Sequence, residues 1–139
     1  MKITSVLKYF VVLLISITSN ILAAEENILT GSAYYLERIL LPENAVFEAT
    51  LEDVSLMDVP AVILGSVTIE PAGQIPIYFA IKYNADDIKL GHHYNVRGKI
   101  TVDGKLKFIT DTMHPVLSRK DSGELKLKMI RLQTAKKKK

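Results

Sequence analysis

Apolar and polar residues alternate along much of this 139-residue chain, and this period of two constrains the fold more than any other feature. Residues 75–82, 94–102 and 125–129 place apolar side chains at every second position, as strands do when one face of a sheet is buried and the other is solvated. Residues 47–52 follow the same pattern, and residues 28–35 form a plausible first strand. No long stretch keeps the helical period of about 3.6 residues, so we predict an all-β domain.

Turn-forming residues separate the expected strands at short intervals. The strongest signal is Asp103-Gly104, because a two-residue type I′ turn needs positive φ at both positions, which Asp and Gly tolerate. It predicts a hairpin between the strands that flank it. Residues 84–88 predict one helical turn, and residues 61–69 are apolar and β-branched enough to predict a central strand. This spacing is typical of a small antiparallel sandwich or partly open barrel of about seven to eight strands.

The first 24 residues have the composition of an export signal. Lys2 and Lys8 precede or border an uncharged, largely apolar stretch that runs to Ala24, where small residues offer a cleavage site. The alternative is an uncleaved membrane anchor, but the stretch is short for a spanning helix and polar residues interrupt its second half. We therefore expect a signal peptide at residues 1–24, cleaved near Ala24, a β-sandwich domain at residues 25–132 and a basic disordered tail at residues 133–139.

The sequence contains no cysteine. A domain of this length can bury an adequate core without disulfides, and thiol chemistry and Cys-metal sites are excluded. Lipidation at a signal cleavage site requires a cysteine. We therefore expect an exported, periplasmic protein that is not lipidated.

The net charge of +3 arises from the two ends of the chain. Lys2 and Lys8 lie in the expected signal and Lys136–Lys139 in the tail, and the residues between them are more acidic than basic. Nucleic-acid binding requires basic residues across the folded surface, so we expect no nucleic-acid partner. For the terminal lysines we expect a disordered tail, with at most weak peripheral contact with a membrane.

Candidate catalytic chemistry rests on His93, His114 and Asp111. Together they support an alternative hypothesis, in which the protein is a metal-binding or hydrolytic domain of the envelope. Zinc sites normally show clustered ligands at set spacings, so we interpret these side chains as polar residues of loops and strand ends. Glu48 and Glu52 share one strand face, which we interpret as solvated. With no Gly-x-Ser-x-Gly motif and no phosphate-binding loop, we predict no enzyme, no catalytic or metal residues and no cofactor.

A small exported β domain without catalytic residues still has strand edges and apolar surface. Such features capture peptide segments by β-augmentation or in an apolar cleft. We therefore favour a binding module, with a purely structural or stress role in the envelope as a further alternative.

Several short motifs follow one another in a specific order across residues 28–132. They include Tyr35-Leu36-Glu37-Arg38-Ile39, Gly73-Gln74-Ile75-Pro76-Ile77-Tyr78-Phe79, Tyr94-Asn95-Val96-Arg97-Gly98-Lys99-Ile100 and Thr110-Asp111-Thr112-Met113-His114-Pro115. In this order the sequence resembles the YbaY/YscW family of small envelope lipoproteins, which includes type III secretion pilotins. The resemblance implies a small β-sandwich. For the pilotin members it implies a chaperone that binds the C-terminal segment of an outer-membrane secretin and helps it reach and assemble in that membrane.

The sequence departs from the pattern of this family in two ways. Pilotins are typically lipidated at an N-terminal cysteine, which is missing here, and His114 stands where members often carry an aromatic residue. Our leading hypothesis is a non-catalytic periplasmic binding or chaperone-like module that assists an envelope or secretion component. Its expected partner is an envelope protein or peptide segment, with the secretin C-terminus as a candidate, and the sequence assigns no partner-binding residues.

Overall fold

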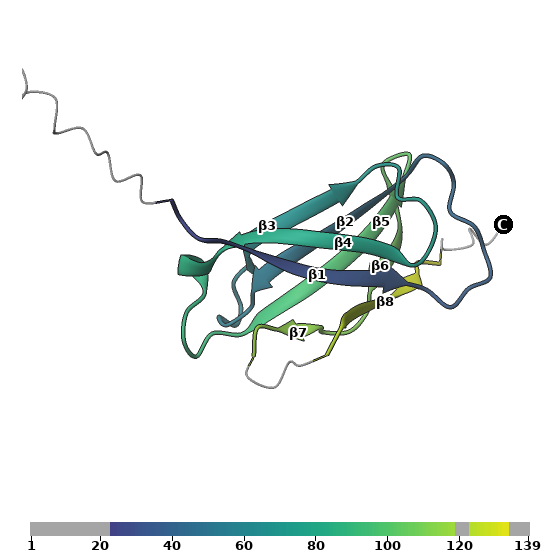
Figure 1. The fold of residues 1–139 in the computed structure, drawn as a ribbon. Coiled ribbons are helices and arrows are strands. Elements are labelled where there is room, and N and C mark those ends of the chain that lie inside the picture. The colour runs from purple at the N-terminus through teal and green to yellow at the C-terminus, as the bar shows by residue number, and fades with distance from the viewer. Residues whose placement is uncertain (1–22, 119–122, 134–139) are drawn as a thin grey trace, which may run out of the picture.

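The computed structural model describes residues 23–118 and 123–133, and within them the chain is almost entirely β-structure (Figure 1). The strands are β1 (Glu26–Tyr34), β2 (Ala45–Asp53), β3 (Val62–Ile69), β4 (Ile77–Asn84), β5 (Tyr94–Val102), β6 (Lys105–Thr110), β7 (Pro115–Val116) and β8 (Leu125–Arg131). A single 3-10 turn, η1 (Ala85–Asp87), is the only helical element in this part of the chain, and Asn84 caps it through its side-chain oxygen. The all-β prediction and the helical turn at residues 84–88 are confirmed.

The strands form one sheet in the order β3-β2-β5-β6-β8-β1-β4, with β7 beside the start of β5. Neighbouring strands run antiparallel except β1 and β8, which are parallel. The sheet is therefore mixed, although the sequence favours a wholly antiparallel one. Only β1 and β8, near the two ends of the domain, make the parallel pair, and local turn signals carry no information about such a distant pairing.

The sheet curls into a nearly closed barrel whose two edge strands, β3 and β4, meet by packing. In Figure 1, β4 and β1 cross in front of β2 and β5. At the seam, a Cβ atom on Gly65 would lie 2.3 Å from the carbonyl oxygen of Lys82 and 2.9 Å from Cγ2 of Ile81. Glycine is thus required at position 65 for the two strands to approach so closely.

The prediction of a central strand at residues 61–69 is wrong, because β3 lies at an edge of the sheet. Its apolar composition has two separate causes. Leu64, Val67 and Ile69 face inward and pack on the core, whereas Val62 and Ile63 are exposed at the start of the strand. A run of apolar residues alone does not distinguish these two situations.

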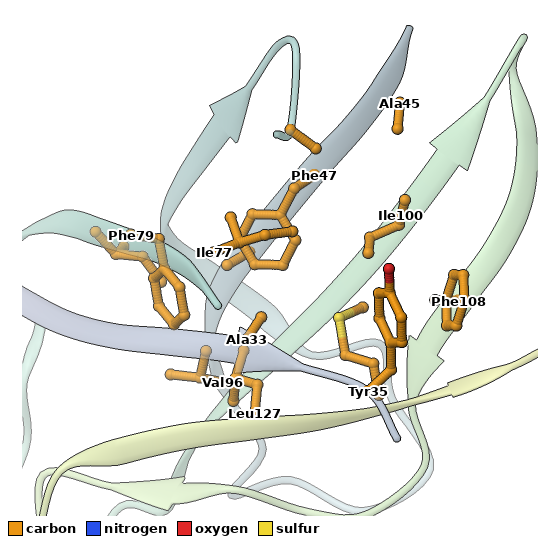
Figure 2. Close-up of a cluster of buried hydrophobic side chains, with 14 of the residues drawn as sticks. Ala33, Tyr35, Ala45, Phe47, Ile77, Phe79, Val96, Ile100, Phe108 and Leu127 are labelled. Atoms are coloured by element: carbon orange, nitrogen blue, oxygen red, sulfur yellow. The ribbon is translucent and has the colours of Figure 1, made fainter. Parts of the chain in front are cut away.

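The core fills the barrel with the inward residues of the alternating strands. Figure 2 shows Phe47 of β2 beside Ile77 and Phe79 of β4, and the rings of Phe47 and Phe79 lie 5.6 Å apart. Tyr35 stacks on Phe108 with a centroid distance of 4.6 Å, and its hydroxyl donates to the carbonyl of Ile39. The first contact connects β2 to β4, and the second connects the residue after β1 to β6. The core therefore depends on side chains from both sides of the barrel.

The turn between β5 and β6 matches the sequence prediction in detail. Asp103 and Gly104 have φ values of 52° and 72°, and Val102 pairs with Lys105. Positive φ at both central positions is the mark of a type I′ turn. The predicted hairpin is confirmed.

Residues 1–22 of the expected signal peptide, and the lysines at 136–139, lie outside the described residues. Within the described residues, no helix is both long and apolar enough to span a membrane.

We expect Phe47→Ala to lower the free energy of unfolding by about 3–5 kcal/mol, because it leaves a cavity in a fully buried site. Urea denaturation monitored by circular dichroism measures this loss. Leu40→Ala is the control, since Leu40 is 81% exposed, and it should change stability by no more than about 0.5 kcal/mol. Equal losses for the two variants would contradict the assignment of the core.

Candidate functional site: an apolar groove between β7 and β8

A groove with a volume of about 1040 Å³ is lined by residues of β1, β3, β4, β7 and the start of β8. The groove arises because β8 divides its backbone hydrogen bonds between two neighbouring strands. Residues 125–128 pair with β1, residues 129–131 pair with β6, and β7 pairs with β5. No pairing in the described part of the chain joins β7 to β8, so the wall of the barrel is open between them.

Partly buried apolar side chains line the groove, and they are continuous with the core. Phe79 and Val116 belong to the core itself, and the others pack against it: Leu29, Val67, Leu117 and Leu125. At the groove wall, a Cβ on Gly31 would lie 2.8 Å from both the Leu125 carbonyl oxygen and the Phe79 ring. Gly31 therefore allows β1, β8 and the Phe79 ring to pack closely.

Leu117, at the edge of the groove just after β7, has a left-handed backbone with φ of 60°. This conformation is unfavourable for a leucine and persists only where the surroundings enforce it. The side chain of Leu117 packs against the core. The packing thus holds a strained residue at the groove edge.

His114 is the titratable side chain in the groove wall that has an unused polar atom. Its Nδ1 is buried and has no hydrogen-bond partner among the described residues. The backbone at this position is fixed, since the His114 amide donates to Oδ1 of Asn95 at 2.7 Å and its carbonyl accepts from the Val96 amide at 3.1 Å. A buried nitrogen without a partner is costly, and an occupant of the groove that bonds to it would remove that cost.

The rim of the groove is polar. Lys126 and Glu124 form an ion pair of 3.3 Å at the start of β8, and Tyr78 of β4 is 70% exposed. An apolar floor with a polar rim suits a segment that presents apolar side chains inward and keeps its backbone or polar side chains at the surface.

A second polar cluster lies outside the groove and joins the β2–β3 loop to the β4–β5 loop. Nδ1 of His92 lies 2.6 Å from Oδ2 of Asp53, and the hydroxyl of Ser55 donates to the same carboxylate. The amide of His93 donates to Oγ of Ser55 at 2.8 Å, and the amide of Val54 donates to the His93 carbonyl at 2.8 Å. We call these contacts the loop clamp.

The loop clamp contains a Ser, a His and an Asp, but its geometry does not resemble a catalytic triad. Ser55 and His92 both bond to the carboxylate of Asp53, whereas a nucleophilic serine must bond to the histidine that removes its proton. Burial of the Asp53 carboxyl acts to raise its pKa, but the hydrogen bonds from Ser55 and His92 outweigh it and lower the pKa to about 2. The arrangement therefore holds a carboxylate ionised and connects two loops.

The structure separates the residues of the alternative site. Within the described residues, no group of three His, Asp or Glu side chains is able to hold a metal ion. The metal site of His93, His114 and Asp111 is therefore wrong: the backbone amide of His93 belongs to the loop clamp and His114 lines the groove. The three residues belong to different strand ends, since His93 precedes β5, Asp111 follows β6 and His114 precedes β7.

The interpretation of Glu52 as a solvated residue is also wrong. Glu52 is buried, and its nearest cation is Arg97, whose Nε lies 3.6 Å from Oε2. The register between β2 and β3 shifts at this point, because β3 contributes the extra residue Leu64 between the partners of Leu51 and Glu52, whereas β2 keeps its regular register with β5. Glu48, by contrast, pairs with Lys99 at 3.1 Å on the outer face, as the alternation predicts.

We expect Asp53→Asn to lower the free energy of unfolding by roughly 1–2 kcal/mol at neutral pH, because it weakens hydrogen bonds to a charged group. The pKa of Asp53 is depressed in the folded state, so its contribution is present above pH 4 and disappears as the pH falls towards 2. Urea unfolding of both proteins at several pH values measures the difference. A difference that is constant from pH 7 to pH 2 would argue against an ionised Asp53 in the clamp.

Comparison with known proteins identifies a family of secretion lipoprotein chaperones. The model of a family described as type III secretion system lipoprotein chaperones (YscW) matches residues 24–129. The uncharacterized lipoprotein YbaY of Escherichia coli (strain K12) is 33% identical over 98 residues, which cover 70% of this chain and 52% of YbaY. The chain thus spans about half the length of this curated relative.

A solved structure shows the same fold. It is that of an alternative pilotin from the type II secretion system of Vibrio cholerae, 37% identical, with a TM-score of 0.73. The match covers 79% of this chain and 100% of the pilotin.

Proposed function

Because the chain belongs to the YscW family of type III secretion lipoprotein chaperones, we propose that it is a non-catalytic, chaperone-like module that binds a segment of an envelope or secretion component in the groove between β7 and β8. The observation that carries this proposal is an apolar groove of about 1040 Å³ that is continuous with the core. The descriptions of the relatives as a chaperone and a pilotin support a binding role. The geometry of Ser55 and His92 offers no activated nucleophile.

The size and lining of the groove define the segment that it accepts. Pockets for small ligands occupy about 300–1,000 Å³, so this groove has room for several side chains of a peptide. The apolar face of an amphipathic helix, or one face of an extended strand, would cover Leu29, Leu117 and Leu125, and a polar group would reach Nδ1 of His114. The C-terminal segment of a secretin is our candidate partner, since the solved relative is a pilotin.

The protein acts in the cell envelope, and we place it in the periplasm. The support is the export-like composition of residues 1–24, the description of the family as secretion lipoprotein chaperones and that of YbaY as a lipoprotein. The sequence has no cysteine to carry a lipid, so we propose that it works without the lipid modification that the word lipoprotein implies for its relatives. Mass spectrometry of the protein recovered from periplasm tests both points, and a lipid-modified mass would contradict the second.

We expect the variant Leu117→Gly to weaken peptide binding while it leaves the stability of the fold nearly unchanged. Glycine adopts the positive φ of this position without strain, which offsets the lost packing, so we expect the free energy of unfolding to change by less than about 1 kcal/mol. Removal of an apolar side chain from the groove should weaken peptide binding by about tenfold. Fluorescence anisotropy with labelled 20-residue peptides that tile a secretin C-terminal segment measures affinity.

The matched control for this experiment is Leu106→Gly, because Leu106 is 43% exposed and lies outside the groove. It should leave peptide affinity unchanged. Binding that is equally strong for the unmodified chain and Leu117→Gly would contradict the groove as the binding site. Absence of binding to every secretin peptide by the folded, unmodified chain would contradict the secretin as partner.

A further inference from the structure

We propose that the segment bound in the groove is an extended strand, with acidic residues beside its apolar ones, that pairs with the free edge of β8. This inference rests on the proposed function, because it specifies how a segment binds at the same site. The groove is lined by β7 and by residues 123–126, which lead into β8. In Figure 1, β7 and β8 lie near each other at one side of the barrel, and no pairing joins them in the described part of the chain.

Two residues of β8 direct backbone groups into this opening. The amide of Leu132, just after β8, donates to the carbonyl of Lys107 at 2.8 Å, so residue 132 turns its backbone groups towards β6. Alternate residues of a strand direct their N–H and C=O groups to the same side, which places those of Lys126 and Lys128 on that side too. β6 pairs only with residues 129–131 of β8. Within the described residues, Lys126 and Lys128 therefore have no strand partner on this edge.

β7, on the other side of the opening, is a poor template for an incoming strand. The amide and the carbonyl of His114 both bond to residues of β5, so the alternation directs the backbone of Pro115 towards the opening. Proline has no N–H to donate, and Leu117 has a positive φ that interrupts a regular strand. The free edge of β8 therefore offers the donors that an incoming strand needs, and β7 does not.

An extended strand satisfies this edge, and a helix does not. The N–H and C=O groups of Lys126 and Lys128 would lose contact with water beneath a segment that covers the groove, and a buried unpaired backbone group is costly. A strand supplies the missing partners by β-augmentation. The backbone groups of a helix are already bonded to one another, so a helix would leave those of β8 unpaired.

The side chains along the free edge define the chemistry of the strand. Leu127 points into the core, whereas Lys126 and Lys128 point outward and are exposed. Residues directly opposite on paired strands lie on the same face, where opposite charges attract. Within the described residues, Lys128 has no ion pair and Lys126 pairs only with Glu124, at 3.3 Å. Acidic residues opposite the two lysines, with an apolar residue between them, therefore fit this edge.

A second copy of the chain is a poor occupant of the same edge. Pairing of two β8 edges would bring Lys126 and Lys128 of one copy next to the same lysines of the other. Like charges directly opposite destabilise a strand pair. The expected partner is therefore a segment of a different, locally acidic sequence.

Alternate backbone N-methylation distinguishes a strand from a helix. The probe is a peptide of alternating valine and glutamate, labelled for fluorescence anisotropy and added to the full chain. A strand directs alternate amides towards its neighbour, so methylation of one alternate set should weaken binding by at least about tenfold. Methylation of the other set should weaken it by less than about twofold. A helix would be disrupted by either set, so equal effects, or no binding of the unmethylated probe, would overturn the proposal.

Charge variants test the acidic preference. Lys128→Gln should weaken binding of the same probe by about two- to fivefold, because it removes an attraction on the free edge. Lys89→Gln, an equal change of charge in the loop between η1 and β5, should leave the affinity unchanged. A peptide with lysine in place of glutamate should bind more weakly. Tighter binding of that peptide, or an unchanged affinity for Lys128→Gln, would contradict the assignment.

Amide hydrogen exchange followed by NMR reports the pairing directly. The amides of Lys126 and Lys128 should exchange at least about tenfold more slowly when the probe is bound, because each gains a hydrogen bond. The amide of Met57, in the β2–β3 loop, should not change. Unaltered exchange at both lysines would contradict pairing with β8.

These outcomes separate the inference from the proposed function. Secretin peptides that bind with equal effects of the two methylation sets, or without protecting Lys126 and Lys128, would retain the groove as a binding site and overturn the strand. Absence of binding by every peptide to the folded chain would overturn both. Sedimentation equilibrium tests the remaining occupant, since a dimer of the free chain that protects the same two amides would assign the edge to a second copy.

Discussion

The architecture depends on how β8 divides its backbone hydrogen bonds between two neighbours. Its first half pairs in parallel with β1 and its second half in antiparallel with β6. A strand that changes partner along its length closes the barrel at one end only. At the other end β7 remains bonded to β5, and the opening between β7 and β8 becomes the groove. The site is thus a consequence of how the barrel closes.

The second seam of the barrel is closed without a hydrogen-bonded ladder. Gly65 and Lys82 bring β3 and β4 into backbone contact, and this closure protects two edge strands that would otherwise offer unpaired amides and carbonyls. Gly31 has the corresponding role at the groove. Gly65 and Gly31 therefore determine where neighbouring strands pack closely. The groove lies where the strands separate, between β7 and β8.

The local features of the chain could be predicted from the sequence, because each depends on neighbouring residues. Alternation located the strands, Asp103-Gly104 located a type I′ turn, and Asn84 located a capped turn. The features that depend on distant pairing could not. The edge position of β3, the burial of Glu52 and the parallel pairing of β1 with β8 have no local signal. The groove belongs to this second class, since five separate strands contribute to it.

The parallel pairing of β1 with β8 also affects the time at which the domain can fold. Gly31 pairs with Leu125, so β1, the first strand of the domain, cannot complete its pairing until β8, the last strand, is present. Contacts between residues so far apart in sequence raise the contact order, and proteins dominated by such contacts fold slowly. Until the C-terminal strand is available, β1 lacks one neighbour and β6 lacks another. The barrel therefore cannot close until β8 is available, so the last strand of the domain determines when the first strand completes its pairing.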